Sequence, residues 1–275
     1  MDERPVGLDR AEGRRLYGRD PSGYDAGRPD YPSGLYDVLE DRCRARADAR
    51  VLEIGPGTGR VTRRLLALGA KVTAVEPNAD IASWLADRLT SPDLQVIVAP
   101  FEDAGLPTAS FDLAVAATSF HWVQPDPGLV ELRRVLRPGA WLALWWILFE
   151  DPSDPDEVDR EVERLLGASP SGAAPGRRPF QLDELGRLGE LRRAGFVDAT
   201  SEVLRSQHRM DAAQTVALYS TMAIVLRRSD DEQTRLLDAL GELVADRFGG
   251  SVTRTFVTAL YTARNPSPGA RSNPG

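Results

Sequence analysis

Val51-Leu52-Glu53-Ile54-Gly55-Pro56-Gly57-Thr58-Gly59 is the stretch of this sequence that decides the fold. An apolar run ends in a carboxylate and a glycine-rich turn, and apolar residues at helical spacing follow. This order predicts a strand, a tight turn and a helix of the nucleotide-binding kind. Glu76 ends the next strand-like run, and in such units an acid about 20 residues beyond the turn accepts hydrogen bonds from a ribose. The stretch therefore predicts an adenosine-containing ligand.

The spacing of the glycines indicates which adenosine ligand the turn favours. A dinucleotide site reads Gly-x-Gly-x-x-Gly, whereas here Gly59 comes one position early and Arg60 stands in the sixth place. Pro56 has no backbone N–H to offer a phosphate, and the Glu53 carboxylate opposes a diphosphate but suits a cation. A Gly-Lys-Ser or Gly-Lys-Thr phosphate loop does not occur in the sequence. The turn thus favours a ligand without phosphates, although a glycine turn alone can also be a plain strand–helix connection.

The turn and several later motifs resemble those of class I S-adenosylmethionine-dependent methyltransferases. The most similar branch acts on small molecules and carries the type 11 methyltransferase domain. The motifs that carry the resemblance are residues 51–60, Val75-Glu76-Pro77-Asn78, residues 111–115, Leu136-Arg137-Pro138-Gly139-Ala140, residues 24–32 and Ser119-Phe120-His121-Trp122. The resemblance covers about residues 17–150 well and the C-terminal third loosely. It implies S-adenosyl-L-methionine as cofactor, S-adenosyl-L-homocysteine as product and no metal ion, and it says little about the methyl acceptor.

Strand and helix patterns alternate along the chain. Strands are expected at 50–54, 71–76, 94–98, 111–117, 139–148, near 198–207 and at 252–263, and helices include 32–46 and 181–194. Such alternation predicts a parallel sheet covered by helices on both faces. In the similar family the last strand runs antiparallel between the fifth and the sixth. The predicted fold class is α/β, a Rossmann-like doubly wound sheet of seven strands, mostly parallel, with a helical lid.

Changes of composition divide the sequence into four parts. Residues 1–15 are expected to be mobile, and residues 16–150 to form the cofactor-binding core with an N-terminal helical segment. Residues 151–264 are expected to supply a lid or insertion, substrate-side helices and the last two strands of the same domain. The Pro-rich 151–180 segment and the apolar helix at 211–227 are the predicted lid, because such elements commonly gate buried chemistry. Residues 265–275 are expected to be a disordered tail.

The composition disfavours several classes of partner. The net charge of −7 and the pI near 5.1 argue against nucleic acid, whose phosphates need a basic surface. No run of 18 or more apolar residues occurs and the first residues are not apolar, so neither a transmembrane helix nor a signal segment is expected. Cys43 is the single cysteine, so an internal disulfide is excluded and a reducing cytoplasm is expected. A monomer or homodimer that binds a small molecule is the expected state, and one cysteine with two histidines cannot form a usual zinc site.

The resemblance implies a set of residues around the cofactor. Arg28 is the expected partner of the cofactor carboxylate, although its Arg-Pro sequence could simply shape a turn. Glu102 or Asp103 is expected near the adenine amino group, and Phe101 either flanks the adenine or belongs to the core. Gly55 and Gly57 are expected under the ligand, where a Cβ would clash. The full predicted cofactor set is Tyr24, Arg28, Glu53, Gly55, Pro56, Gly57, Glu76, Pro77, Phe101, Glu102, Thr118 and Ser119.

The segment after the fourth strand is expected to face the reactive methyl group. Methyl transfer from a sulfonium mainly requires alignment and the exclusion of water, and a base is needed only where the acceptor must lose a proton. His121 is the candidate base, and its alternative is a satisfied structural histidine, which is also our interpretation of His208. The predicted substrate pocket consists of Tyr31, Phe120, Trp122, Trp146 and Tyr219.

Four functions remain in competition. The favoured one is transfer of a methyl group to oxygen, nitrogen or carbon of a small acceptor, such as a natural-product intermediate or a small carboxylic acid. The first rival is a protein of the same fold that binds the cofactor but catalyses a non-methylating reaction or none. An NAD-dependent oxidoreductase is disfavoured by Pro56 and Arg60. A nucleic-acid methyltransferase is disfavoured by the acidic charge and by the absence of an Asn/Asp-Pro-Pro-Tyr motif after the fourth strand.

Overall fold

The computed structural model describes residues 20–173 and 177–267. The chain divides into two compact units. Unit 1 contains Met1–Tyr31, Ile147–Leu182 and Arg205–Thr258, and unit 2 contains Pro32–Trp146, Asp183–Leu204 and Ala259–Gly275. The strands β5, β6 and β7 each contribute residues to both units. The expected mobile residues 1–15 and the end of the expected tail, 268–275, lie outside the described residues.

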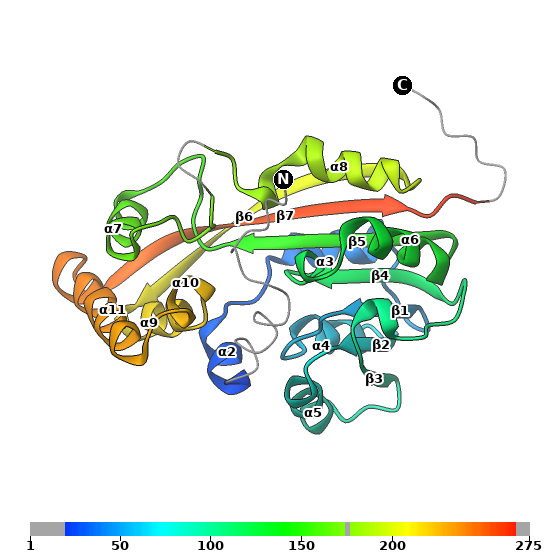
Figure 1. Cartoon of the computed structure of the whole chain (residues 1–275), viewed down its shortest axis with the longest axis horizontal. Coiled ribbons are helices and arrows are strands. Elements are labelled where there is room, and N and C mark those ends of the chain that lie inside the picture. The colour runs from blue at the N-terminus through cyan, green and yellow to red at the C-terminus, as the bar shows by residue number, and fades with distance from the viewer. Residues whose placement is uncertain (1–19, 174–176, 268–275) are drawn as a thin grey trace. The chain divides into compact units, whose positions relative to one another are not determined.

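A seven-stranded sheet organises the molecule (Figure 1). Its strand order is β3-β2-β1-β4-β5-β7-β6, and the last strand of the sequence runs antiparallel. This confirms the predicted doubly wound fold class and the place of β7 between the fifth and sixth strands. The strands are β1 (Arg50–Ile54), β2 (Lys71–Glu76), β3 (Leu94–Val98), β4 (Phe111–Ala117), β5 (Leu136–Leu148), β6 (Val197–Asp211) and β7 (Ser251–Arg264).

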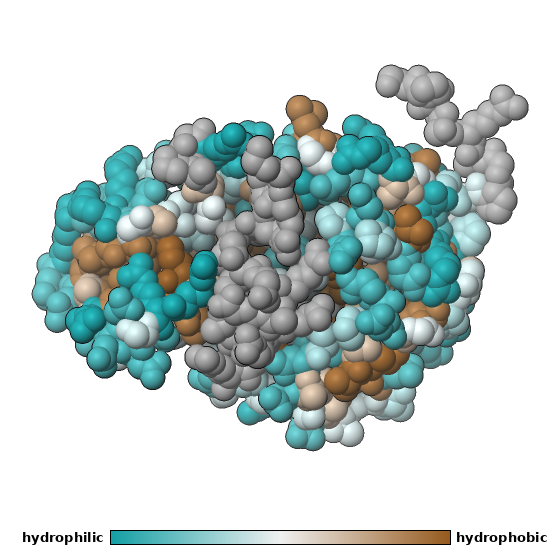
Figure 2. Space-filling model, viewed as in Figure 1, coloured by the Kyte–Doolittle hydropathy of each residue, from teal (hydrophilic) through white to brown (hydrophobic). Residues whose placement is uncertain are grey.

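Parallel pairing brings the carboxyl ends of the first strands to one edge of the sheet. In β1, Glu53 is opposite Ala74 of β2 and Val115 of β4. Buried apolar residues dominate the inner strands because helices cover both faces, and Leu52 and Leu113 are completely buried. The edge strand β3 is less covered, with Val98 56% exposed, and Figure 2 shows an apolar area of the surface where this strand lies.

The start of a helix in unit 2 is fixed in different ways. Asn78 caps α5 by accepting hydrogen bonds from the backbone N–H groups of Asp80 (2.9 Å) and Ile81 (3.1 Å). Gly59 precedes α4 in the left-handed region, with φ at 83°. The helices of unit 2 are α3 (Ser33–Asp41), α4 (Arg60–Ala67), α5 (Ala79–Arg88), α6 (Pro125–Val135) and α8 (Glu184–Arg193), with short 3-10 turns η1 (Phe101–Asp103) and η2 (Phe120–Trp122).

Unit 1 has a hydrophobic core of its own, which includes Leu218, Val225, Leu240 and Phe256. Three of its helices start with a capping box, in which the N-cap side chain and the third helical residue satisfy each other's backbone N–H groups. Its helices are α2 (Pro21–Gly27), α7 (Glu157–Leu166), α9 (Ala212–Ser220), α10 (Ala223–Leu226) and α11 (Asp230–Glu242), with the turns η3 (Phe180–Leu182) and η4 (Leu243–Arg247). The predicted lid segments belong to this unit, and their role as a lid stays a prediction.

Several element boundaries differ from those expected. The helix predicted over 32–46 ends at Asp41, and three residues later Arg44 takes a left-handed backbone with φ at 61°, which a continuing helix does not allow. The sixth strand continues to Asp211, well beyond the predicted 207. Asn265, at the start of the expected disordered tail, is buried, and its side chain donates to the carbonyl oxygen of Leu136 (2.9 Å). Order therefore extends at least through this residue.

Candidate functional site

The glycine turn after β1 has a left-handed backbone at each of its three glycines, with φ of 64° at Gly55, 55° at Gly57 and 83° at Gly59. A Cβ on Gly55 would lie 2.6 Å from the Cβ of Ser119, and one on Gly59 would lie 2.3 Å from Leu85. A Cβ on Gly57 would meet nothing within 4 Å. Gly55 and Gly59 are therefore required by packing inside the protein, and only Gly57 leaves open space above the turn. We expected a ligand to require both Gly55 and Gly57. In the structure Gly55 is required by its contact with Ser119, and only at Gly57 does open space leave room for a ligand.

Glu53 lies at the carboxyl end of β1 and is only 1% exposed. One carboxylate oxygen, Oε2, accepts a hydrogen bond from the Thr62 hydroxyl at 2.6 Å. The other oxygen, Oε1, is buried and has no hydrogen-bond partner among the described residues. Burial raises the pKa of Glu53 to about 7, and the Thr62 hydroxyl lowers it only in part. A buried acceptor without a partner is costly, so this oxygen fits a hydrogen-bond donor or cation from a ligand.

Glu76 holds the matching place at the end of β2 and is 6% exposed. Its Oε1 accepts a hydrogen bond at 3.0 Å from the backbone N–H of Asn78, just beyond Pro77 at the start of α5. Since Ile54 pairs with Val75, the two acids end neighbouring strands. Glu53 and Glu76, which were both predicted from the sequence as cofactor-binding residues, thus lie at the same edge of the sheet. Together they favour a cationic or hydroxyl-rich ligand over a diphosphate.

The three residues predicted to lie near the adenine, Phe101, Glu102 and Asp103, form the η1 turn after β3 and differ in burial. Phe101 is 3% exposed and belongs to the core, which is one of the two alternatives that the sequence left open. Glu102 and Asp103 are both exposed. Glu102 accepts a hydrogen bond from the backbone N–H of Gln124 at 3.2 Å. A contact of Glu102 or Asp103 with an adenine stays a prediction.

The end of β4 is bent back onto its neighbours. Thr118 has φ at 53°, uncommon for a β-branched residue, and its N–H donates to the carbonyl oxygen of Trp145 at 2.7 Å. The Ser119 hydroxyl donates a short hydrogen bond to the carbonyl oxygen of Ile54. This bond ties the end of β4 to the end of β1, so the Ser119 hydroxyl already serves the packing of the turn. Strained backbone of this kind concentrates at functional sites.

His121 is held in one tautomer by Trp146. The indole N–H of Trp146 donates to Nδ1 of His121 at 3.1 Å, and an indole nitrogen can only donate. Nδ1 is therefore unprotonated, and the neutral ring carries its proton on Nε2. Burial lowers the pKa of His121 to about 4, which keeps the ring neutral. In this arrangement His121 offers an N–H and not a lone pair at Nε2, so its geometry suits a hydrogen-bond donor.

Four of the predicted residues, Tyr24, Arg28, Tyr31 and Tyr219, belong to unit 1. The Arg28 guanidinium donates to the Thr221 hydroxyl (2.7 Å) and carbonyl (3.1 Å), and it lies over the rings of Tyr24 and Phe149, 4.9 and 4.5 Å from their centroids. These contacts give Arg28 a structural role, whereas its pairing with a cofactor carboxylate stays a prediction. Tyr31 packs against the core of the unit.

Tyr219 is fully buried, and its hydroxyl accepts a hydrogen bond from Arg254 at 3.1 Å. Sequence reasoning missed Thr62, Thr221 and Arg254, because the partner of a buried polar group is chosen by tertiary packing. Trp122 and Phe120 lie in η2 beside His121, with the His121 and Trp122 rings 4.6 Å apart. No cluster of three or more His, Cys, Asp or Glu suited to a metal ion occurs in the parts of the chain that the structure describes.

Comparison with known proteins supports this reading of the fold and the turn. A model of the methyltransferase domain matches residues 52–144, which include the glycine turn, β2 to β4 and most of β1 and β5. An uncharacterised methyltransferase of Schizosaccharomyces pombe is 32% identical over 237 residues, covering 84% of this chain and 87% of that protein. An uncharacterised methyltransferase of Mycobacterium tuberculosis is 36% identical over 130 residues, which are 47% of this chain and 51% of that protein. The chain therefore spans about half the length of the mycobacterial relative.

Solved structures agree with the sheet order. A chain from Anaeromyxobacter dehalogenans assigned as a type II methyltransferase has a TM-score of 0.62 and 27% identity, covering 87% of this chain and 99% of that one. The [4+2]-cyclase SpnF has a TM-score of 0.59 and 19% identity, covering 95% of this chain and 98% of that one. The order of the strands and the glycine turn are those of a class I methyltransferase with a Rossmann-like fold. This chain belongs to the S-adenosylmethionine-dependent methyltransferase family.

Proposed function

We propose that this protein transfers a methyl group from S-adenosyl-L-methionine to a small-molecule acceptor and releases S-adenosyl-L-homocysteine. The observation that carries the proposal is the buried Oε1 of Glu53, which has no partner among the described residues and lies at the carboxyl end of the strand that leads into the glycine turn. A carboxylate at this place suits a cationic aminoacyl group, and Glu76 at the next strand end suits a ribose. The residues present therefore fit this cofactor, and they oppose a phosphate-bearing one.

The chain's own residues would bind and orient the reactants. S-adenosylmethionine, when bound, supplies a methyl group that is already activated for displacement. The strand ends that carry Glu53, Glu76 and Ser119 form a fixed frame, so alignment of the reactants is the main contribution of the protein. His121 presents an Nε2–H, which suits a hydrogen bond to an acceptor that needs no base. A small carboxylic acid, ionised in water, is one acceptor of this kind; a natural-product intermediate is the other acceptor class that we propose.

The second candidate function is a non-methylating reaction on the same cofactor site. It is favoured by the likeness to the [4+2]-cyclase SpnF, which covers nearly the whole chain at 19% identity. This likeness concerns the fold alone. An NAD-dependent oxidoreductase is the less favoured alternative, because the register of the glycine turn and Glu53 oppose a diphosphate.

The test is isotopic transfer. The protein is incubated with cofactor that carries a labelled methyl group and with a panel of small carboxylic acids, phenols and amines, or with a cell extract. A product heavier by one labelled methyl supports the proposal. Calorimetric binding of S-adenosylhomocysteine without any labelled product, across the panel and the extract, would favour the second candidate.

The remaining features of the proposal concern the setting of the reaction. We infer a monomer or homodimer of the reducing cytoplasm that acts on free small molecules and not on nucleic acid. The acidic net charge of −7 and the single cysteine, which is buried, support this inference. In the part of the chain that the structure describes, no helix is both long and apolar enough to cross a membrane.

A further inference from the structure

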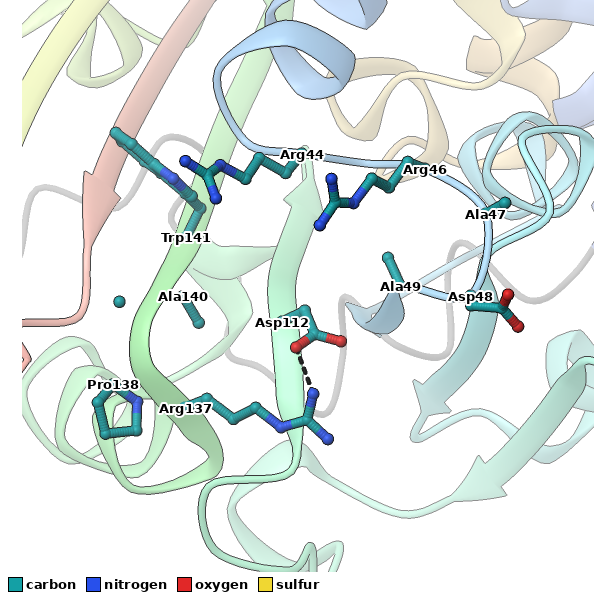
Figure 3. A pocket seen from close by; sticks show the side chains of 11 residues that line it. Arg44, Arg46, Ala47, Asp48, Ala49, Asp112, Arg137, Pro138, Ala140 and Trp141 are labelled. Carbon is teal, nitrogen blue, oxygen red and sulfur yellow. Dashed lines mark hydrogen bonds and ion pairs between the residues drawn. The ribbon is translucent and has the colours of Figure 1, made fainter.

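A cavity of about 460 Å³ lies at the amino ends of β1, β4 and β5 in unit 2. The glycine turn follows the carboxyl end of β1, so the cavity lies at the opposite end of these strands. Its volume falls within the range of about 300–1,000 Å³ that is common for small-ligand pockets. The residues that line it are Arg44, Arg46, Ala47, Asp48, Ala49, Asp112, Arg137, Pro138, Gly139, Ala140 and Trp141 (Figure 3).

The charge of this cavity is positive, in contrast to the acidic chain. Both aspartates in its wall already have cationic partners. Asp112 pairs with Arg137 and also accepts the backbone N–H of Arg50 at 2.9 Å, and Asp48 pairs with Lys71 at 2.9 Å. The two remaining arginines, at positions 44 and 46, have no acidic partner among the described residues. The cavity therefore carries two uncompensated positive charges.

The loop that carries Arg44 and Arg46 is fixed by the fold. Cys43 and Ala45 are buried and alternate with the two exposed arginines, so the loop is anchored on one side and presents both arginines on the other. Its backbone is held by hydrogen bonds from Cys43 to Val38 (3.1 Å) and from Ala45 to Leu39 (2.8 Å).

The backbone conformation of this loop is itself unusual. Arg44 and Asp48 have φ of 61° and 62°, in the left-handed region that residues other than glycine rarely adopt. Such conformations concentrate at active sites and ligand clamps. The loop thus presents its two guanidinium groups from a backbone that hydrogen bonds and buried neighbours hold in place.

We propose that this cavity binds a small phosphorylated ligand that carries a planar ring, of the nucleoside diphosphate kind. Arg44 and Arg46 would hold the phosphate oxygens, because a guanidinium matches phosphate geometry with two parallel N–H donors. Trp141 is half-buried and is the one aromatic residue among those that line the cavity, so its indole is the group that would stack on the ring. The two ends of the strands then select opposite charges: the end with Glu53 and Glu76 favours a cationic ligand, and the end with the arginines favours an anion.

The test measures ADP binding to the full-length protein by calorimetry at low ionic strength. Saturable binding is expected in the wild type, about tenfold or more weaker in the double variant R44Q/R46Q. The matched control is R192Q/R193Q, which removes the same charge from two exposed arginines of α8 that do not line the cavity. The control should bind ADP with an affinity within about twofold of the wild type, because the proposal attributes binding to local contacts with Arg44 and Arg46 and not to the net charge of the protein.

Three results would overturn the proposal. They are absence of saturable ADP binding, equal weakening in the two double variants, and displacement of ADP by S-adenosylhomocysteine, which would place ADP at the glycine turn. The variant W141L adds a further check: it should weaken ADP binding while leaving pyrophosphate binding unchanged, and equal effects on both would remove the ring from the proposal. None of these results depends on methyl transfer.

Discussion

At the scale of single residues, the two acids and the histidine of the candidate site owe their chemistry to burial. Glu53 was selected by its place before the glycine turn, but its raised pKa and its unpartnered oxygen follow from the tertiary structure. His121 was predicted as a candidate base. A base accepts a proton, but the hydrogen bond from Trp146 leaves His121 with a protonated Nε2, which donates a hydrogen bond. Catalysis by His121 stays a prediction.

The raised pKa of Glu53 predicts a pH-dependent affinity. With a pKa of about 7 in the free protein, Glu53 must lose its proton to pair with a cationic aminoacyl group. Affinity for S-adenosylhomocysteine should therefore rise between about pH 6 and pH 8, and proton release should accompany binding below pH 7. Calorimetry in buffers of different ionisation enthalpy measures both. In E53Q the affinity should be lower and nearly flat over this range; a pH profile identical to that of the wild type would contradict the assignment.

The same pKa shift has a consequence for the stability of the free protein. A carboxyl whose pKa is raised on folding binds its proton more tightly in the folded state, so its stabilising contribution is complete below the unfolded value of 4.5 and is lost as the pH rises through about 7. E53Q, which cannot ionise, should therefore unfold at a higher urea concentration than the wild type at pH 8. The two proteins should differ less at pH 5, and urea titration at both pH values checks this.

Variants of His121 distinguish a donor from a base. H121Q keeps an N–H near the position of Nε2, so it should retain most of the methyl-transfer activity, whereas H121A should lose about 1–2 kcal/mol of transition-state stabilisation. W146F frees the tautomer and should lower turnover with little effect on S-adenosylhomocysteine affinity. Nitrogen-15 spectra of the His121 ring should show protonated Nε2 in the wild type and a mixture of tautomers in W146F. An Nδ1-protonated ring in the wild type would restore the general-base hypothesis.

At the scale of elements, the glycines of the turn have two different roles, one in helix packing and one in leaving space for a ligand. Gly59 lets α4 and α5 approach each other, and Gly57 leaves space above the turn. The sequence places both glycines in one pattern and cannot separate their roles, because the neighbour that a Cβ would meet comes from a different part of the chain.

Two alanine variants separate these roles. Both place an alanine in the left-handed region, at a cost of about 1–2 kcal/mol. G59A also drives a methyl group into Leu85, so it should lower the melting temperature more than G57A does. G57A should instead show the larger loss of S-adenosylhomocysteine affinity, because its methyl group fills the open space. Thermal unfolding and calorimetry on both variants provide the comparison, and the reverse order would contradict the assignment.

The core of unit 1 depends on a buried arginine. Arg254 is 1% exposed and donates to Asp159, to the Phe149 carbonyl (2.9 Å) and to the Tyr219 hydroxyl. Its replacement by methionine would leave Asp159 buried without its cation, at a cost of about 3–5 kcal/mol. R254M should therefore unfold at much lower urea concentration than the wild type, and R254M/D159L should recover part of the loss. A single variant as stable as the wild type would show that the network contributes little.

At the scale of the whole molecule, the favoured ligand should stabilise the folded chain by mass action. S-adenosylhomocysteine at about 100 times its dissociation constant should add roughly 2.7 kcal/mol to the free energy of unfolding and raise the melting temperature. NADH should not compete with it in a fluorescence titration, because the turn opposes a diphosphate. Competition between the two would revive the oxidoreductase alternative.

The division into units is the feature of the whole molecule that the sequence did not predict. The sequence was interpreted as one domain in which residues 151–264 add a lid and two strands. In the structure, part of the N-terminal segment and the helices α7, α9 and α11 form a compact unit with its own core. Contacts between residues far apart in sequence define such a unit, and hydrophobic periodicity reports only which face of each helix is apolar.

The sequence by itself determined the succession of strands and helices and the two acids at the strand ends, because periodicity and glycine spacing are local properties of the chain. The place of the last strand in the sheet came from the resemblance to a known family. Only the tertiary structure decided which polar groups are buried and which groups are their hydrogen-bond partners. It left one oxygen of Glu53 without a partner, fixed the tautomer of His121 through Trp146 and gathered the arginines of the cavity. Desolvation and hydrogen-bond pairing depend on neighbours from distant segments, so this chemistry arises only once the chain has folded.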